Sequence, residues 1–122
     1  MSKLEPLKDK PLDEFIKDSY LQDIVERNLE IAAQCCIDIA NRIISVEGLE
    51  KPKDYYGAIL KLGEANIISL EFAKNFAPIS GLRNILVHDY LEIEWKKVYE
   101  HLKNLNDFYK FMEEIIKWLK TK

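Results

Sequence analysis

The sequence predicts an all-α fold, an antiparallel bundle of four to five helices. Apolar residues recur at spacings of three and four over long stretches, as in amphipathic helices. The chain contains no Asn-Gly or Asp-Gly hairpin turn and no sustained alternation of apolar and polar residues, so strand signals are weak. At 122 residues it is long enough for one hydrophobic core and too short for two. We therefore expect residues 1–122 to form one domain, with a poorly ordered N-terminal segment at residues 1–10.

Two helices are expected in the first part of the chain. Pro11 followed by acidic residues is typical of a first helical turn, and predicts a short helix beginning there. Ser19 or Asp18 can cap a second, long helix that runs to about Val46. The apolar positions predicted to form its buried stripe are Leu21, Ile24, Val25, Leu29, Ala32, Cys36, Ile39 and Ile43.

Three shorter pieces and a long final helix should follow. Gly48 ends the long helix, Asp54 caps a helix over about residues 55–65, and Ser69 begins another that ends near Ala77. A further helical piece is expected from Ile79. The last helix should run from about residue 95 to 120. Its predicted buried positions are Val98, Leu102, Leu105, Phe108, Met112, Ile115, Ile116 and Leu119.

The composition excludes several classes of protein. A net charge of −3 argues against a protein that coats nucleic acid by bulk electrostatics, and no apolar run reaches the ~20 residues of a membrane span. The N-terminus lacks the apolar core of a signal peptide, so we expect a cytoplasmic protein. Adjacent Cys35 and Cys36 offer no disulfide framework or metal-ligand spacing, and are expected to be small buried helix residues. We expect no metal and no cofactor.

One short stretch concentrates the polar residues that could perform chemistry. Arg83, Asn84, His88 and Tyr90 fall within eight residues, in a chain where only three of 18 basic residues are arginine. A guanidinium can grip a phosphate with two hydrogen bonds, and an imidazole can move a proton near neutral pH. These are the two groups that metal-free cleavage of RNA needs, because the ribose 2′-hydroxyl supplies the nucleophile.

Spacing alone also permits a structural explanation, and favours it. Residues five apart do not share a helix face. Arg83 and His88 can still converge if the long arginine side chain reaches the neighbouring face, if the helix ends near His88, or across a two-fold dimer. Arg83 could instead pair with a carboxylate of the long helix, such as Asp38, which could equally hold Arg83 in place for catalysis. His101 is expected to be a solvated surface residue. The lysines at 96–97 and 117–122 are expected to be solvated, with a phosphate-binding track as the alternative.

The motif Arg-x4-His-x-Tyr, formed by residues 83–90, resembles the signature of HEPN-domain ribonucleases and more closely the HepT toxin branch. The segments 21–30 and 36–40 are similar to the long helix of that branch, and Gly81-Leu82 leads into the motif in the same way. The resemblance covers about residues 11–120, and it reverses the preference for a structural role.

The resemblance implies a HEPN-like helical bundle that forms a homodimer with its two motifs facing each other. It implies a metal-independent endoribonuclease, the toxin of a type VII HepT/MntA-like toxin–antitoxin system. Arg83 and His88 take the catalytic positions, and Asn84 the polar position after the arginine. Tyr90 matches the tyrosine that an MntA-type nucleotidyltransferase antitoxin modifies with AMP. The family usually has a further helix before the position of Pro11, which only about ten residues precede here, and we expect an exposed apolar groove or a larger dimer interface in its place.

A second hypothesis, from another class, is a non-catalytic helical adaptor that binds a nucleotidyltransferase partner or a nucleotide. A third is a protein that binds RNA without cutting it. Unlike the ribonuclease hypothesis, the second and third hypotheses both predict that the protein does not cleave RNA.

Overall fold

The computed structural model describes residues 5–7, 9–81 and 95–122, and in this part of the chain every regular element is helical. The elements are the 3-10 turn η1 (Glu5–Leu7) and the helices α1 (Leu12–Lys17), α2 (Ser19–Val46), α3 (Tyr55–Glu64), α4 (Leu70–Phe76), α6 (Trp95–Lys103) and α7 (Leu105–Lys120). The predicted all-α fold is confirmed. Among these residues no helix is both long and apolar enough to cross a membrane.

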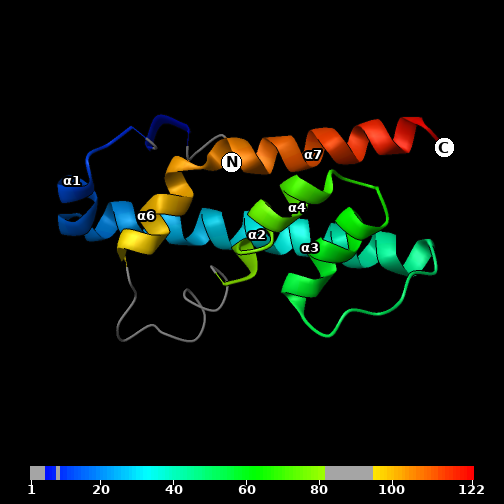
Figure 1. The fold of residues 1–122 in the computed structure, drawn as a ribbon. Helices are drawn as coiled ribbons and strands as arrows, with labels where there is room; N and C mark the ends of the chain where they lie inside the picture. Colours follow the sequence, from blue (N-terminus) through cyan, green and yellow to red (C-terminus); the bar gives the residue numbers. More distant parts are fainter. Residues whose placement is uncertain (1–4, 8, 82–94) are drawn as a thin grey trace.

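Helix α2 is the axis around which the other helices pack (Figure 1). Helix α3 lies against α2, α4 packs on α3, and α1 and α6 lie at the N-terminal end of α2 (Figure 1). Helix α7 also contacts α2, and both run from left to right in Figure 1, so this pair is parallel. The core lies between these helices.

Helix α2 begins and ends where the sequence predicts. The Asp18 carboxylate accepts a hydrogen bond of 3.1 Å from the backbone N–H of Leu21, and Gly48 follows the helix with a φ of +66°. Its buried face is turned around the helix axis relative to the predicted stripe. Ala33, Ile37 and Ala40 are fully buried. Three residues predicted to be buried are only partly so: Ile24, Ala32 and Ile39.

The short helices α3 and α4 pack closely against each other. Asp54 caps α3 by accepting a 2.7 Å hydrogen bond from Gly57 N–H, and Ser69 caps α4. At Gly63 a side chain would not fit, because a Cβ there would lie 2.6 Å from the Cβ of Ala73. The glycine therefore permits the close approach of α4, at the cost of some intrinsic helix stability.

The predicted single final helix is wrong: it is two helices that meet at Asn104 and change direction there (Figure 1). The buried face of α7 also differs from the prediction. Met112, Ile116 and Leu119 are exposed, whereas Phe111 is fully buried.

An aromatic cluster explains the rotation of α7. The ring of Phe76 on α4 stacks on Phe111 at 5.1 Å and meets the edge of Phe108 at 5.6 Å between ring centres. Phe72 stacks on the other side of Phe76, at 5.1 Å. Large rings bury more apolar area than the aliphatic residues on the neighbouring stripe, so the helix turns Phe108 and Phe111 inward.

Helix α6 is held by the N-terminal part of the chain. The Tyr99 hydroxyl donates a 2.6 Å hydrogen bond to the carbonyl oxygen of Lys10, and the Tyr99 ring lies 5.6 Å from that of Phe15 on α1. Because α6 begins at Trp95, these contacts fix the position of the first helix described after residue 81.

Candidate functional site

Four of the five predicted site residues, Arg83, Asn84, His88 and Tyr90, lie outside the described residues. Their predicted roles therefore stay predictions. The described chain defines the two ends of the segment that carries them, and the surfaces around those ends.

The chain enters the motif segment from a helical stretch at residues 79–81. Ser80 is buried, and its hydroxyl donates a 3.0 Å hydrogen bond to the carbonyl oxygen of Ala77. This bond satisfies the hydroxyl inside the protein and fixes the turn after α4. The first residues of the predicted helical piece at Ile79 are thus confirmed.

A hollow of about 530 Å³ lies directly beside this entry point. It is lined by Lys53, Asp54, Tyr55, Tyr56, Ser80 and Gly81. Lys53 and both tyrosines are exposed, whereas the Asp54 carboxylate is engaged in capping α3. A lysine attracts phosphates and a tyrosine ring can stack on a base, so the hollow suits a single-stranded nucleic acid. Tyr55 and Tyr56 occur at helical spacing, which favours core or interface positions over a base-stacking platform, yet both are exposed. Only the fold brings residues 53–56 and residues 80–81 to one hollow.

Asp38 lies on the exposed side of α2. Its Oδ1 accepts a 2.8 Å hydrogen bond from the side-chain amide of Gln34, one helical turn earlier. The carboxylate is therefore accessible to an incoming basic group. Whether it holds Arg83 is a prediction about a residue outside the described chain.

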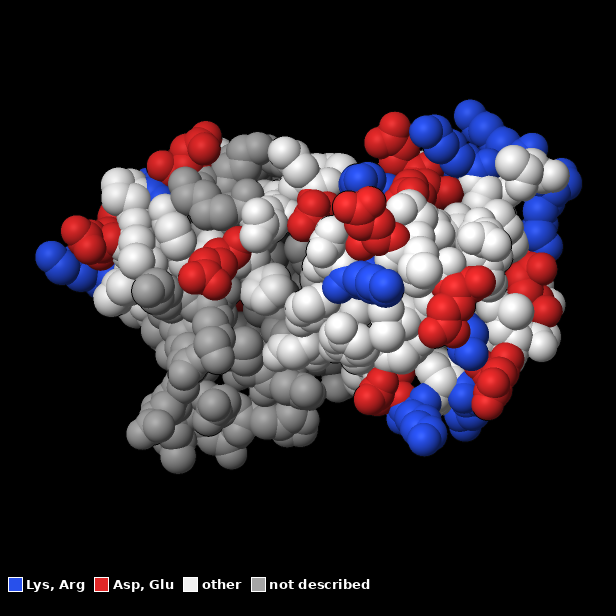
Figure 2. Space-filling view, in the orientation of Figure 1, with Lys and Arg blue, Asp and Glu red and all other residues white. Residues whose placement is uncertain are grey.

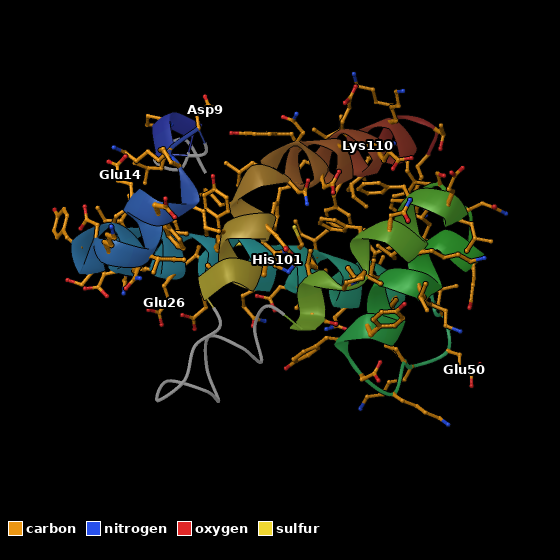
Figure 3. All side chains as sticks on the ribbon, turned by 60° about the vertical axis from the view of Figure 1, so that its left-hand side comes forward. Asp9, Glu14, Glu26, Glu50, His101 and Lys110 are labelled. Atoms are coloured by element: carbon orange, nitrogen blue, oxygen red, sulfur yellow. The ribbon has the colours of Figure 1, made fainter. Side chains whose placement is uncertain are left out.

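His101 is not the solvated residue that the sequence suggested. It lies on the side of α6 turned towards the middle of the molecule, whereas Glu14 and Lys110 lie at the periphery (Figure 3). It is half-buried and lines a hollow of about 210 Å³ together with Asn75 of α4, Asp107 of α7 and Asn104 between α6 and α7. Burial lowers the pKa of His101, and the nearby charge of Glu100 opposes that shift only in part. The neutral imidazole is therefore favoured.

The two cysteines have different environments. Cys36 is buried, as expected, and burial together with the neighbouring Cys35 raises the pKa of its thiol to about 12. Cys35 is exposed, contrary to the expectation that both would be buried. The reason is the helix itself, because consecutive residues lie about 100° apart around the axis.

Basic side chains gather where α7 ends, at the upper right of Figure 2. Lys117 and Lys120 lie in the last turn of that helix. Lys122 pairs with Glu47, and its ammonium lies 4.8 Å from the centre of the Trp118 ring. This end of the molecule is opposite α1 and α6 (Figure 1). These lysines are therefore solvated or paired within the protein, and they do not surround residues 79–81.

Three comparisons place the chain among known proteins. The sequence profile of the ribonuclease HepT-like family matches residues 1–115. The chain is 39% identical over 88 residues to the tRNA nuclease HepT of Aphanizomenon flos-aquae, a match that covers 72% of this chain and 60% of that protein. It is 36% identical over 103 residues to the mRNA nuclease HepT of Shewanella oneidensis, covering 84% of this chain and 77% of that one.

The fold agrees with the sequence match. The solved structure of a tri-AMPylated Shewanella oneidensis HEPN toxin in complex with MNT antitoxin superposes with a TM-score of 0.80 at 32% identity, over 95% of this chain and 85% of that one. The family profile spans the motif at residues 83–90 as well as the described helices up to residue 115. The chain belongs to the ribonuclease HepT-like family.

Proposed function

We propose that this protein is a metal-independent endoribonuclease and the toxin of a type VII HepT/MntA-like toxin–antitoxin pair. The observation that carries the proposal is a family match over residues 1–115, which includes the complete Arg-x4-His-x-Tyr motif. Both curated relatives above are RNA nucleases, one named for tRNA and the other for mRNA. The proposed substrate is accordingly RNA, and the proposed location is the cytoplasm.

The chemistry follows from RNA and from two side chains. A base removes the proton of the ribose 2′-hydroxyl, and the 2′-oxygen attacks the adjacent phosphorus. The bond from phosphorus to the 5′-oxygen breaks, the 5′-oxygen takes up a proton, and a 2′,3′-cyclic phosphate remains. His88 serves as the base or the acid in this sequence. Arg83 neutralises the charge that builds on the non-bridging oxygens, and Asn84 orients the phosphate or ribose.

The hollow beside residues 80–81 supports an RNA substrate. Lys53 supplies positive charge and Tyr55 and Tyr56 supply exposed rings next to the start of the motif segment. A few basic groups gathered beside a site can attract a phosphate chain even when the net charge of the protein is −3.

Silencing by AMP is proposed for Tyr90. Its phenol oxygen would attack the α-phosphorus of ATP on the antitoxin, and pyrophosphate would leave. The bulky, anionic group would then block the site and repel RNA phosphates. The support is the motif position of Tyr90 and the AMPylated state of the related HEPN toxin in its antitoxin complex.

The test is RNA cleavage by purified Arg83→Ala and His88→Ala variants, in the presence of chelator, on tRNA and mRNA separately. We expect each variant to lose activity by at least about 100-fold, because positioned acid–base groups contribute about 10²–10⁴-fold. The matched control is His101→Ala, which removes the other histidine and should retain cleavage.

Wild-type cleavage by both catalytic variants would refute the catalytic assignment. A parent protein that cuts no RNA, yet binds a nucleotidyltransferase tightly, would support the adaptor hypothesis in its place. RNA binding that weakens with salt and yields no product would instead support a non-cutting RNA-binding protein.

A further inference from the structure

Two hollows at the start of α3 adjoin each other and form one groove. The first is the hollow beside residues 80–81. The second, also about 530 Å³ in volume, lies between the C-terminal end of α2 and the loop that leads to α3. Lys53, Asp54 and Tyr55 line both. We call the two together the 51–56 groove; its polar and aromatic members include Asn41, Ser45, Lys51, Lys53, Tyr55 and Tyr56.

The charge of the 51–56 groove suits a phosphate chain. Lys51 and Lys53 are exposed, and neither forms an ion pair with another residue in the described part of the chain. Among the described residues that line the groove, the acidic one is Asp54. Its carboxylate caps α3 and lies at the positive end of the α3 dipole, which offsets its charge. The two ammonium groups therefore remain available to phosphates.

The aromatic rings of the groove are well placed to stack on bases. Tyr55 and Tyr56 are 37% and 43% exposed, whereas Ile59, one turn further along α3, is fully buried. The first turn of α3 is thus less covered by neighbouring helices than the turn that follows. An exposed ring offers a flat apolar face to an unpaired base, whereas a base within a duplex is already stacked on both sides. The rings therefore favour single strands.

The backbone that carries these side chains is fixed before any ligand binds. The cap joins Asp54 to the N–H of Gly57 at 2.7 Å. A Cβ at Gly57 would lie 3.1 Å from Oδ1 of Asp54 and 3.4 Å from the Cβ of Pro52, so glycine lets the loop close tightly on α3. Lys53 and Tyr56 are held on either side of this cap. Less ordering is then needed when a ligand binds, which favours affinity.

We propose that the 51–56 groove is the path along which single-stranded RNA reaches the motif segment, with one base stacked on Tyr56 and the flanking phosphates on Lys53 and Lys51. The groove ends at Gly81, two residues before Arg83 in the sequence. This inference rests on the proposed function and adds how the RNA is held and selected. Side chains that contact RNA away from the reacting phosphate determine affinity and leave the chemical step unchanged.

Other surfaces of the molecule fit RNA less well. The hollow around His101 is smaller, about 210 Å³, and is lined by Glu100 and Asp107. Among the described residues that line it there is neither lysine nor arginine. The lysines at the end of α7 lie on the upper side of the bundle in Figure 1, away from the loop between α2 and α3, and Lys122 is paired with Glu47. Residues of α7 therefore provide matched controls.

The first test measures binding without cleavage. The probe is a labelled single-stranded RNA oligonucleotide with 2′-O-methyl groups, which keeps the bases and phosphates and lacks the 2′-hydroxyl nucleophile. We expect Tyr56→Ala to raise the Kd at least about 10-fold in fluorescence anisotropy. Tyr56→Phe should bind like the parent, because stacking needs the ring and not the hydroxyl. The control Tyr109→Ala removes a ring that is similarly exposed, 41%, on α7 and should leave the Kd unchanged.

The preference for single strands is measured with the same probe annealed to its complement. The duplex should bind at least about 10-fold more weakly than the single strand, because its bases cannot stack on Tyr56. In Tyr56→Ala this difference should shrink, since the variant loses the contact that distinguishes the two forms.

The salt dependence of binding tests the two lysines. The double variant Lys51→Gln, Lys53→Gln should flatten the slope of log affinity against log salt by about 1.4, because each phosphate contact on a single strand contributes about 0.7. The double variant Lys117→Gln, Lys120→Gln removes the same charge from the end of α7 and should leave the slope unchanged. Circular dichroism checks that every variant is folded.

Photo-cross-linking gives a readout that does not depend on affinity. A single-stranded probe with 5-iodouridine, which cross-links to an aromatic ring stacked on it, should be recovered on the tryptic peptide of residues 54–61. This peptide contains Tyr55 and Tyr56. A cross-link found solely on peptides of α7 would place the RNA elsewhere and overturn the inference.

The kinetics of cleavage separate this inference from the catalytic assignment. On unmodified RNA, Tyr56→Ala should raise KM at least about 10-fold with a kcat close to that of the parent, because the lost contact is equal in the ground state and the transition state. A variant with a lower kcat and an unchanged KM would contradict the proposed role.

The inference is overturned if Tyr56→Ala and the double variant at residues 51 and 53 both bind the probe like the parent, or if the duplex binds as tightly as the single strand. If the parent still cuts RNA in that case, this inference alone falls. A parent that binds the probe as described and cuts no unmodified RNA would remove the proposed function alone.

Discussion

Helices α2 and α7 are held in the bundle in different ways. Helix α2 buries small and aliphatic side chains along 28 residues, and an N-terminal cap holds its first turn. Helix α7 depends on a compact aromatic cluster around Phe76, and its N-cap residue, Asn104, makes no capping hydrogen bond. The comparison suggests that packing is distributed along α2 and concentrated in α7. A helix with distributed packing can leave one whole face for another partner.

The largest effect should come from removing the centre of the aromatic cluster. Phe76 is almost fully buried, and we expect Phe76→Ala to reduce the free energy of unfolding by about 3–5 kcal/mol. The comparison variant is Leu29→Ala on α2, where the expected loss is about 2–5 kcal/mol. Urea unfolding measures both. A larger loss for Leu29→Ala would contradict the view that α7 depends on one concentrated cluster.

The N-caps of α2 and α7 allow a second comparison, in which the expected losses of unfolding free energy are smaller. Asp18→Ala removes the hydrogen bond to Leu21 N–H and should lower the free energy of unfolding by about 1 kcal/mol. Asn104→Ala removes no capping hydrogen bond, so its effect should stay within about 0.5 kcal/mol. If Asp18→Ala and Asn104→Ala lost equal unfolding free energy in thermal or urea unfolding, Asn104 would stabilise α7 as much as Asp18 stabilises α2.

The smallest effect concerns pH and the junction between α6 and α7. Burial lowers the pKa of His101 in the folded protein below its ordinary value of about 6.5. The unfolded chain therefore binds a proton first as the pH falls. The contribution of the neutral His101 imidazole to the free energy of unfolding is fully present above pH ~6.5. It is lost as the pH falls through the lower pKa that His101 has in the folded protein.

Urea unfolding of His101→Gln and the parent between pH 7.5 and pH 5 tests this expectation. The parent should lose more stability than the variant over that range. A parent that becomes more stable than the variant on acidification would mean that His101 is charged in the folded protein.

Local signals in the sequence predicted where α2, α3 and α4 begin. Asp18, Asp54 and Ser69 act as caps because a short polar side chain reaches the free N–H groups within the same turn. The end of α2 at Gly48 follows from the same local chemistry. The motif at residues 83–90 was recognised from its residues alone, and the family match confirms the resemblance, while the roles of its side chains stay predictions.

The sequence by itself determined the helical class, the caps and the motif, since each depends on residues a few positions apart. Only the tertiary structure decided that the final helix breaks at Asn104, that α7 turns Phe111 inward and Met112 outward, and that His101 is half-buried. It also decided that Tyr56 and Gly81 line the same hollow. The physical reason is that the side of a helix that is buried depends on the neighbours it meets, and those neighbours come from distant parts of the chain.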